Sequence, residues 1–244
     1  MHQFSTARGG FTLLEMIVVV VILVVLLALI MPALSSARDD AITVTCNSNL
    51  RQCGTVLATY GVDHDNALPP AAPAPRLPAT VFLYQQGPDR GDLRRALYGY
   101  MSKFDVWMCP ALESAPPIDD ASNTRNICFG TYAYWPGRTS PSFGSAGAVP
   151  AGFLDADRPS GTPMMQDTYA DATSPGLKWY NHGEGELQST LAANPSNQVI
   201  RGDTGQGANI LFYDGHAVWH HADQLQNVGY WSERLGVDAY SVMP

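Results

Sequence analysis

Residues 11–31, FTLLEMIVVVVILVVLLALIM, form an apolar run in which Glu15 is the one charged residue. At 1.5 Å per residue, a helix of about 21 residues covers the roughly 30 Å hydrocarbon core of a bilayer. The polar segment before it, residues 1–10, carries one firm positive charge at Arg8, which weakly favours a cytoplasmic position for this segment. The run therefore predicts a membrane-spanning helix, with the rest of the chain outside the cytoplasm.

Two simpler interpretations of the apolar run leave features unexplained. A secretory signal peptide cut near Ser35-Ser36-Ala37 would have an apolar region of only about 7 to 15 residues. A plain single-span anchor leaves Glu15 without a role. A carboxylate within an apolar span costs several kcal/mol unless it is protonated or paired, so Glu15 is a candidate functional residue that needs a partner.

The run Gly9-Gly10-Phe11-Thr12-Leu13-Leu14-Glu15 closely resembles the type III signal of prepilins. By this resemblance, a dedicated membrane peptidase cuts after Gly10 and methylates the new amino terminus at Phe11. The freed ammonium of Phe11 in one subunit can then neutralise Glu15 of its neighbour inside an apolar filament core. The implied partners are prepilin peptidase, other pilin or pseudopilin subunits, the membrane and an inner-membrane assembly platform.

Pro32 lies near the end of the apolar run, at an offset where many type IV pilins carry a proline. Proline removes one hydrogen bond of a helix, which predicts a kink or local melting at this point. The alternative is that Pro32 merely marks the exit from the membrane, and the two interpretations place the chain in the same class.

The helix is predicted to continue beyond the membrane. Apolar residues recur after Pro32 at spacings close to three and four, which is typical of an amphipathic helix. They are Leu34, Ala37, Ala41, Val44, Leu50, Cys53, Leu57 and Tyr60. With Gly61 as the stop signal, one helix is expected from about residue 11 to residue 60. We therefore divide the chain into a leader (1–10), a transmembrane helix (11–32), an amphipathic helix (33–61) and an extracytoplasmic head (62–244).

The head resembles a large prepilin-like family of unknown function that is abundant in planctomycete bacteria. The resemblance rests on the run Cys46-Asn47-Ser48-Asn49-Leu50-Arg51-Gln52, on Tyr60 with residues 63–70, on Cys109-Pro110 and on a carboxy-terminal Asp-Gly pair. In that family a histidine lies ten residues before the aspartate of this pair. Thr204 occupies the position here, so this chain lacks the histidine.

The clearest strand pattern of the head flanks Asp214-Gly215, between residues 208–213 (ANILFY) and 216–220 (HAVWH). Asp-Gly between alternating runs predicts a two-residue type I′ turn with positive φ at both residues. Across this turn Phe212 faces Ala217 and Ile210 faces Trp219, while Tyr213 and His216 lie opposite each other on the other face. We expect the apolar face to cover the long helix.

The rest of the head is expected to be rich in loops. Residues 69–78 predict an extended loop, because proline and alanine dominate there without an apolar period. We expect a short helix at 92–100, a short strand at 106–109 that ends before Pro110, and another strand at 130–135.

The four cysteines are candidates for disulfide bonds in an exported protein. Cys46 and Cys53 are seven residues apart on one predicted helix, about 10 Å along its axis, which is too far for a mutual bond. A bridge between Cys109 and Cys128 would close a loop of about 20 residues and stabilise the fold by roughly 3 kcal/mol. Bridges from the helix cysteines to these two fit the sequence equally well.

Composition argues against several function classes. The 244 residues carry a net charge of −8, which opposes electrostatic binding of nucleic acid. The sequence has no Gly-x-Ser-x-Gly motif, and we predict no enzymatic activity. A carboxy-terminal group of acidic and histidine residues could be taken for a metal or catalytic site: Asp203, Asp214, His216, His220, His221 and Asp223. We instead interpret Asp214 as a turn residue and His216, His220 and His221 as ordinary strand residues. Calcium is the candidate cofactor, because main pseudopilins hold it in a carboxy-terminal loop, but no ligand residue can be transferred.

These observations predict an α+β, pilin-like fold in which one long helix packs on a small antiparallel sheet with long loops. The predicted function is that of a structural subunit of a type IV pilus or type II secretion-like filament. After insertion as a single-pass protein of the inner membrane, the subunit would enter a filament in the periplasm or at the cell surface. The alternative is an exported or membrane-anchored module that binds a ligand or calcium and uses the prepilin signal for export.

Overall fold

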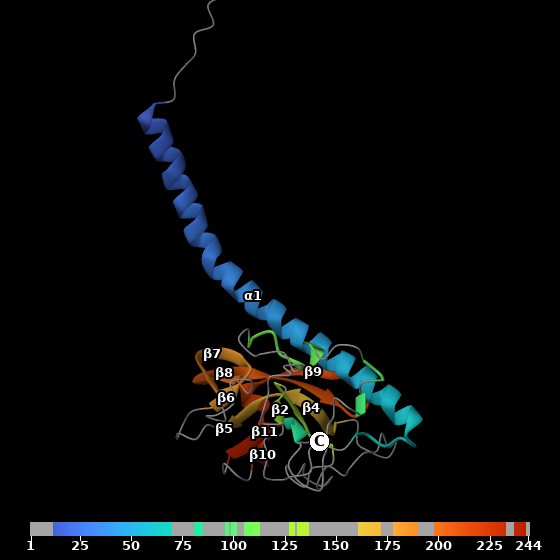
Figure 1. Cartoon of the computed structure of the whole chain (residues 1–244). Coiled ribbons are helices and arrows are strands. Elements are labelled where there is room, and N and C mark those ends of the chain that lie inside the picture. The colour runs from blue at the N-terminus through green and yellow to red at the C-terminus, as the bar shows by residue number, and fades with distance from the viewer. Residues whose placement is uncertain are drawn as a thin grey trace, which may run out of the picture. The chain divides into compact units, whose positions relative to one another are not determined.

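The computed structural model describes residues 12–69, 81–84, 96–97, 99–101, 105–112, 127–129, 131–136, 161–171, 178–189, 198–232 and 237–242. The chain divides into two compact units, Met1–Ala41 and Ile42–Pro244. The main described elements are one long helix and antiparallel strands, with short 3-10 helices between them (Figure 1). The predicted α+β fold of pilin type is confirmed.

The long helix α1 spans Leu13–Asp63 and is continuous through Pro32. Of the two expectations for Pro32, local melting is therefore absent, because a proline removes only one backbone donor from the helix, and a kink stays a prediction. The helix also passes the predicted stop at Gly61. It ends where Asp65 and Asn66 adopt left-handed backbone angles, with φ of 53° and 63°, and the Asn66 N–H donates to the Gly61 carbonyl at 2.8 Å.

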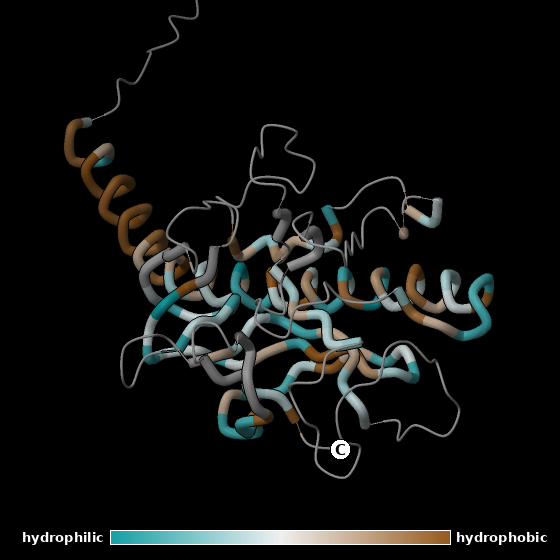
Figure 2. The backbone as a smooth tube through the Cα atoms, turned by 60° about the horizontal axis from the view of Figure 1, so that its bottom comes forward, coloured by the Kyte–Doolittle hydropathy of each residue, from teal (hydrophilic) through white to brown (hydrophobic). Residues whose placement is uncertain are grey.

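Two parts of α1 differ in exposure. From Leu13 to Met31 the apolar side chains are exposed, and Figure 2 shows this part as the most hydrophobic stretch of the helix. Further along, the buried positions recur at helical spacing: Cys46, Leu50, Cys53, Gly54, Leu57 and Gly61. The predicted amphipathic face is thus right from Leu50 to Tyr60, which is partly buried against the core. Its earlier part is wrong, because Val44 is exposed and the buried face runs back from Leu50 through Cys46 to the partly buried Ile42.

Nine strands form the main sheet within the described residues, in the order β10-β11-β5-β6-β8-β4-β3, with β7 and β9 also paired to β8. Their bounds are β3 Tyr132–Tyr134, β4 Pro163–Asp167, β5 Tyr169–Asp171, β6 Lys178–Tyr180, β7 His182–Ser189, β8 Gln198–Phe212, β9 Ala217–His221, β10 Gln226–Ser232 and β11 Val237–Ser241. A separate pair joins β1, Val81–Tyr84, to β2, Ile127–Phe129. The long strand β8 is central, because it pairs with β4, β6, β7 and β9.

Two short strand predictions have different outcomes. The strand expected at 130–135 is present as β3. The strand expected at 106–109 is wrong, because a 3-10 helix η1 spans Asp105–Trp107 and the Met108 N–H donates back to the Asp105 carbonyl at 3.0 Å. This turn buries Trp107 and Cys109, two residues apart, without strand geometry. Most of the helix expected at 92–100 and most of the loop expected at 69–78 lie outside the described residues. A second 3-10 helix, η3, spans Ala222–Gln224 after β9.

The hairpin between β8 and β9 forms, but its register differs by one residue from the prediction. Leu211 pairs with Ala217 and Ile210 with Val218. Gly215 has a φ of 87°, whereas Asp214 is not among the residues with positive φ, so the turn is not type I′. The Phe212 carbonyl accepts from the Gly215 N–H, and the Phe212 N–H donates to the His216 carbonyl, both at 2.9 Å. The extra loop residue moves Tyr213 from the strand into the turn.

Because the register moved, the opposite face of β8 covers the helix. Leu211 and Ala217 belong to the core cluster that also holds the buried residues of α1, while Ile210 and Phe212 belong to a second cluster. A Cβ atom added at Gly54 of α1 would lie 3.0 Å from Leu211 Cδ1, so helix and sheet are in close contact at this glycine. The prediction that Ile210 and Phe212 face α1 is therefore wrong.

Candidate functional sites

The amino-terminal end of α1 is closed by a reciprocal pair of residues, Thr12 and Glu15. The backbone N–H and the hydroxyl of Thr12 donate to Glu15 Oε2 at 2.9 and 2.8 Å, and the Glu15 N–H donates to the Thr12 hydroxyl at 3.3 Å. This is a capping box, which satisfies donors that the first turn of a helix otherwise leaves free. In the single chain, Glu15 is thus held by its own helix. Gly10 and Phe11, the predicted processing residues, lie outside the described residues.

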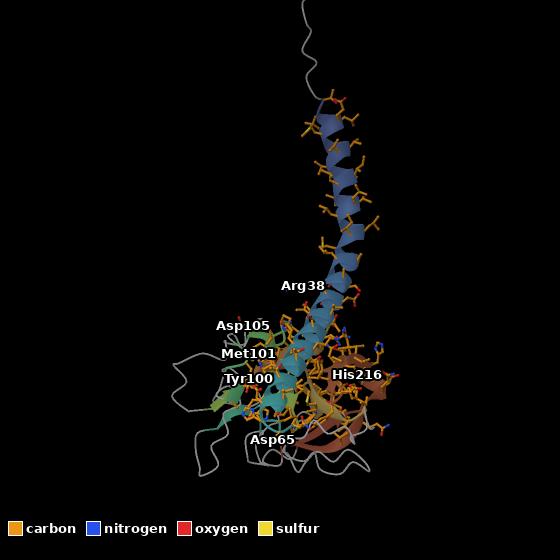
Figure 3. The ribbon with its side chains drawn as sticks, turned by 90° about the vertical axis from the view of Figure 1, so that its right-hand side faces the viewer. Arg38, Asp65, Tyr100, Met101, Asp105 and His216 are labelled. Carbon is orange, nitrogen blue, oxygen red and sulfur yellow. The ribbon has the colours of Figure 1, made fainter. Side chains whose placement is uncertain are left out.

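The apolar part of α1 offers a large surface for packing. Among the described residues, α1 is the helix long and apolar enough to cross a membrane. The side chains of Leu13–Met31 point outward around the helix, as the sticks in Figure 3 show. Glu15 is the one charged residue of this stretch. A surface of this kind is compatible with lipid or with the same helix of neighbouring subunits.

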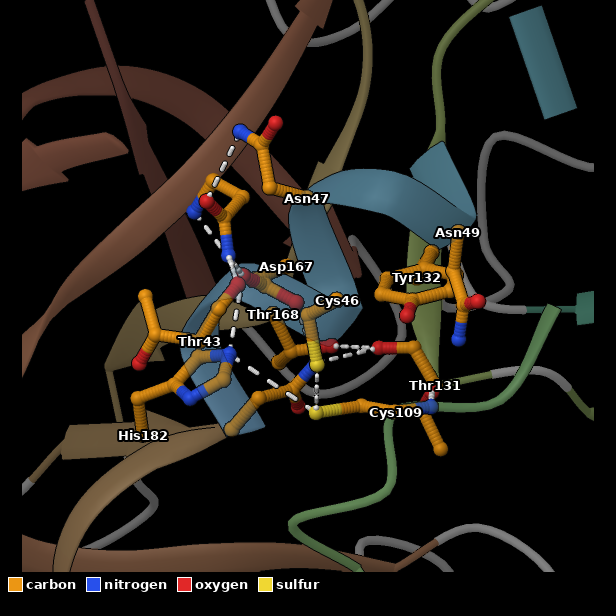
Figure 4. A network of polar contacts seen from close by, with 12 residues as sticks. Thr43, Cys46, Asn47, Asn49, Cys109, Thr131, Tyr132, Asp167, Thr168 and His182 are labelled. Atoms are coloured by element: carbon orange, nitrogen blue, oxygen red, sulfur yellow. Dashed lines mark hydrogen bonds and ion pairs between the residues drawn. The ribbon is translucent and has the colours of Figure 1, made fainter. Parts of the chain in front are cut away.

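A second candidate site lies in the core of the head, where four donor side chains from distant segments meet. Cys46 comes from α1, Cys109 follows η1, Asp167 ends β4 and His182 begins β7. One donor atom of each lies within 4.8 Å of the others, and all four residues are buried. Cys46 Sγ is 2.7 Å from Cys109 Sγ, His182 Nε2 is 3.7 Å from Cys109 Sγ, and His182 Nε2 is 3.0 Å from Asp167 Oδ2. Figure 4 shows the imidazole facing both the carboxylate and the sulfur atom.

Asp167 is held in place by backbone and side-chain amides. The Asn209 backbone N–H and its Nδ2 donate to Asp167 Oδ2 at 2.8 and 2.9 Å, and Asn181 Nδ2 donates to Oδ1 at 3.2 Å. Asn209 also reaches the helix, because its Nδ2 donates to the Thr43 carbonyl at 3.2 Å and its Oδ1 accepts from Asn47 at 3.1 Å. The cluster is therefore built into the contact between α1 and the sheet.

Without a bound ion, burial and the pairing of charges set the pKa values of the cluster residues. Burial acts to raise the pKa of Asp167, but the charge of His182 and the donated hydrogen bonds outweigh it, so the pKa lies below its usual value. Burial acts to lower the pKa of His182, but the Asp167 carboxylate raises it to about 10. These two residues form a buried ion pair. Burial and the neighbouring Cys46 thiol raise the pKa of Cys109 well above its usual value.

The cysteines are placed differently from the simplest expectation. Cys109 is a free thiol that lies against Cys46, and the side chain of Cys128 lies outside the described part of the chain. Cys53 is separate from this pair, since its thiol is directed at the Val106 carbonyl at 3.6 Å and burial raises its pKa well above the usual value. Contact between the helix cysteine Cys46 and Cys109 is one of the pairings that the sequence left open.

The carboxy-terminal residues named from sequence act locally. Asp214 Oδ1 accepts from the His216 N–H at 3.1 Å, which is the turn role predicted for it. His216 stacks on Phe212 with ring centroids 4.3 Å apart. Thr204 donates to the Glu184 carbonyl at 2.6 Å across β7 and β8. The buried histidine of this region is His182, whose backbone pairs with Gly207 of β8.

Sequence reasoning missed Asp167 and His182. Neither belongs to a motif of fixed spacing, and the four residues are separated in sequence by 63, 58 and 15 positions. The sequence offered two signals, the two cysteines and the polar Asn181-His182 pair that follows an aromatic strand. Neither signal shows that Asp167 is the carboxylate that lies beside them.

The comparison with protein families agrees with the geometry of the amino terminus. Residues 5–31 match the family described as prokaryotic N-terminal methylation motif. The amino terminus carries a prepilin-type signal. Such a signal implies processing by prepilin peptidase and assembly at the membrane with other pilins, and together with the apolar helix it indicates a single-pass membrane-anchored protein. Neither the curated proteins nor the solved structures gave a match to this chain.

Proposed function

We propose that the chain is a structural subunit, a pilin or pseudopilin, of a type IV pilus or a type II secretion-like filament. The observation that carries the proposal is the methylation motif at residues 5–31, which coincides with an exposed apolar helix and places Glu15 in its first turn. The prepilin is cut after Gly10, methylated on Phe11 and passed to an inner-membrane assembly platform. The head, residues 62–244, then lies outside the cytoplasm.

Assembly exchanges one set of partners of Glu15 for another. In the single chain its carboxylate is satisfied by the donors of Thr12. In a filament, the ammonium of Phe11 from a neighbouring subunit adds a full positive charge beside this carboxylate. Because an unpaired charge is costly in an apolar environment, the pairing favours one axial offset between neighbouring helices. The apolar side chains of 13–31 then pack against the same stretch of other subunits.

No enzymatic role is part of this proposal. The cluster in the head is buried, with exposures of 0% for Cys46, 1% for Cys109, 0% for Asp167 and 4% for His182, so a substrate would have no access to it. The head is proposed to act as a structural and interaction domain.

The alternative function, a calcium-binding or ligand-binding module that uses the prepilin signal for export, receives less support. Among the described residues, the donor group that converges contains two thiols and an imidazole. Calcium prefers six to eight oxygen ligands, so this group does not suit it.

Processing is tested by expressing the full chain with and without prepilin peptidase and measuring its intact mass and amino-terminal sequence. The expected product begins at N-methylated Phe11 only when the peptidase is present. A product that begins near Arg38 would identify a secreted protein cut by signal peptidase, and an unchanged Met1 with active peptidase present would reject processing.

Assembly is tested with Glu15→Ala in cells that build the filament. The variant is expected to be processed normally and to be absent from sheared filaments, because the pairing with Phe11 is lost. Asp40→Ala is the matched control, since Asp40 is an exposed acid on the same helix beyond the apolar run. Incorporation of Glu15→Ala at the level of the control would refute the assembly role.

A further inference from the structure

The four buried donors of the head form a set that a metal ion recognises. Two thiolates, one imidazole nitrogen and one carboxylate oxygen are the ligands that zinc takes in tetrahedral protein sites. Each comes from a different segment, so one ion would link α1, the residues after η1, β4 and β7. All four residues are at most 4% exposed, so solvent does not compete for the position between them.

We propose that Cys46, Cys109, Asp167 and His182 bind one divalent transition-metal ion, with zinc preferred, and so fasten α1 to the sheet of the head. The proposal is independent of the filament role, because it rests on the core of the head alone. It assigns a metal ligand to a helix residue, Cys46, and another to the segment that the sequence predicted as a strand.

The distances need only a small change for coordination. With Zn–S bonds of about 2.3 Å, tetrahedral geometry places two sulfur atoms roughly 3.8 Å apart, so the 2.7 Å between Cys46 and Cys109 must open by about 1 Å. The 3.7 Å between His182 Nε2 and Cys109 Sγ, and the 3.0 Å between Nε2 and Asp167 Oδ2, already lie in the range that a shared ion requires. The Nε2 atom faces both neighbours, so the ion replaces the proton that it now donates to Asp167.

Residues around the cluster support metal ligands in the way that known sites do. Ligating carboxylates are normally oriented by further hydrogen bonds. Asp167 receives three from Asn209 and Asn181. Zinc with two thiolates and one carboxylate has a net charge of −1, and these amide donors point at the atoms that carry the excess negative charge. The Cys109 N–H also donates to the Thr131 hydroxyl, which fixes the loop that presents this cysteine.

A disulfide between Cys46 and Cys109 is the competing state. It would use the two sulfur atoms but would leave Asp167 and His182 as a buried ion pair with no link to the bond. Burying two charges is costly, and such a pair often stabilises a protein no more than apolar residues of the same volume. An ion uses all four side chains at once, and for this reason we favour it.

The experiment measures metal content and thiol state on the full chain, purified from the membrane in detergent without reductant or chelator. We expect one zinc per chain by elemental mass spectrometry, and free thiols at Cys46 and Cys109 in the peptide map. Cys46→Ser, Cys109→Ser and His182→Gln should lose the zinc. Cys53→Ser is the matched control and should retain it, because Cys53 is a buried cysteine of the same helix that lies outside the cluster.

A second measurement uses the wild-type chain, so that the proposal can still be tested if the variants fail to fold. The wild-type chain is stripped of metal and loaded with Co²⁺ alone, and its absorption spectrum is recorded. Sulfur-to-cobalt charge transfer in the near ultraviolet, together with the strong visible bands of tetrahedral Co²⁺, supports the site. Absence of these bands overturns the proposal, as does zinc that persists in the cluster variants. A stoichiometric Cys46–Cys109 disulfide in the purified chain overturns it in favour of a covalent link.

Discussion

The contact between Leu211 of β8 and Gly54 of α1 allows a quantitative test of how the helix packs on the sheet. Leu211 is fully buried, and Leu→Ala changes at such positions typically cost about 2 to 5 kcal/mol, of which part comes from the cavity left behind. Gly54 has no side chain to fill that cavity. We therefore expect Leu211→Ala to lower the free energy of unfolding by about 3 to 4 kcal/mol.

The reverse change on the helix has a smaller net effect. A methyl group added by Gly54→Ala would lie 3.0 Å from Leu211 Cδ1 and 3.3 Å from Cδ2. Overpacking of this kind costs about 1 to 3 kcal/mol. Replacing glycine by alanine in a helix returns about 1 kcal/mol. The single variant is therefore expected to lose roughly 0 to 2 kcal/mol.

The two changes together should compensate. In the Leu211→Ala background the added methyl group meets a cavity rather than a side chain, so Gly54→Ala should stabilise that background by about 1 to 2 kcal/mol. The double variant is then less destabilised than the sum of the single ones by roughly 2 kcal/mol, which is within the range measured for residues in direct contact.

The assay is urea unfolding of the full chain in detergent, followed by the fluorescence of the buried tryptophans Trp107 and Trp135. Val218→Ala is the control, because Val218 on β9 is 42% exposed and should change stability by less than about 0.5 kcal/mol. Additive effects of Gly54→Ala and Leu211→Ala, within about 0.5 kcal/mol, would show that the helix does not contact β8 at this point.

Three further predictions concern the head. Gly215→Ala should cost about 1 kcal/mol, because Gly215 has a φ of 87° and an added Cβ would meet nothing within 4 Å; unchanged stability in urea would contradict the left-handed turn. Asn209→Ala removes side-chain donors to Asp167 and to the Thr43 carbonyl and should lower the free energy of unfolding by about 2 to 4 kcal/mol. The control Asn49→Ala loses one partly buried hydrogen bond to the Met108 carbonyl and should cost about 1 kcal/mol. Equal losses of stability for the two variants in the same assay would refute the role of Asn209. In chain freed of metal by a chelator, the stability that comes from the Asp167–His182 pair should be fully present between about pH 4 and 6.5. This contribution should fall below that range as Asp167 is protonated, and fall above it as the pH rises toward the His182 pKa of about 10. A urea midpoint that is flat from pH 6.5 to 10 and equal to that of His182→Gln would refute the pairing.

Local chemistry explains why the amino-terminal features of the chain could be predicted from sequence. An apolar run of about 21 residues suffices to predict a helix that crosses a bilayer, and an acid inside it is conspicuous whatever the rest of the chain does. The match at residues 5–31 confirms the prepilin character of this signal. The turn role of Asp214 was predictable for the same reason, since an aspartate side chain bonds to the backbone two residues further on.

Errors appear where a choice between two faces depends on one residue. The alternating pattern around Asp214-Gly215 predicted a hairpin correctly, but a loop longer by one residue reverses which side chains of β8 face the helix. The same applies to the start of the buried face on α1, where Ile42 and Cys46 pack against the core cluster and Val44 is exposed. Packing decided both, because each alternative satisfies the local pattern equally well.

The amino-acid sequence by itself determined the membrane helix, its processing signal and the α+β class, because these depend on composition and spacing within short segments. Only the tertiary structure decided that Cys46, Cys109, Asp167 and His182 meet. The helix, η1 and β4 are placed by apolar contacts in the core and β7 by its pairing with β8, and the distance between their polar side chains follows from that placement. Spacing along the chain carries no information about such a meeting, since nothing local constrains residues 15 to 63 positions apart.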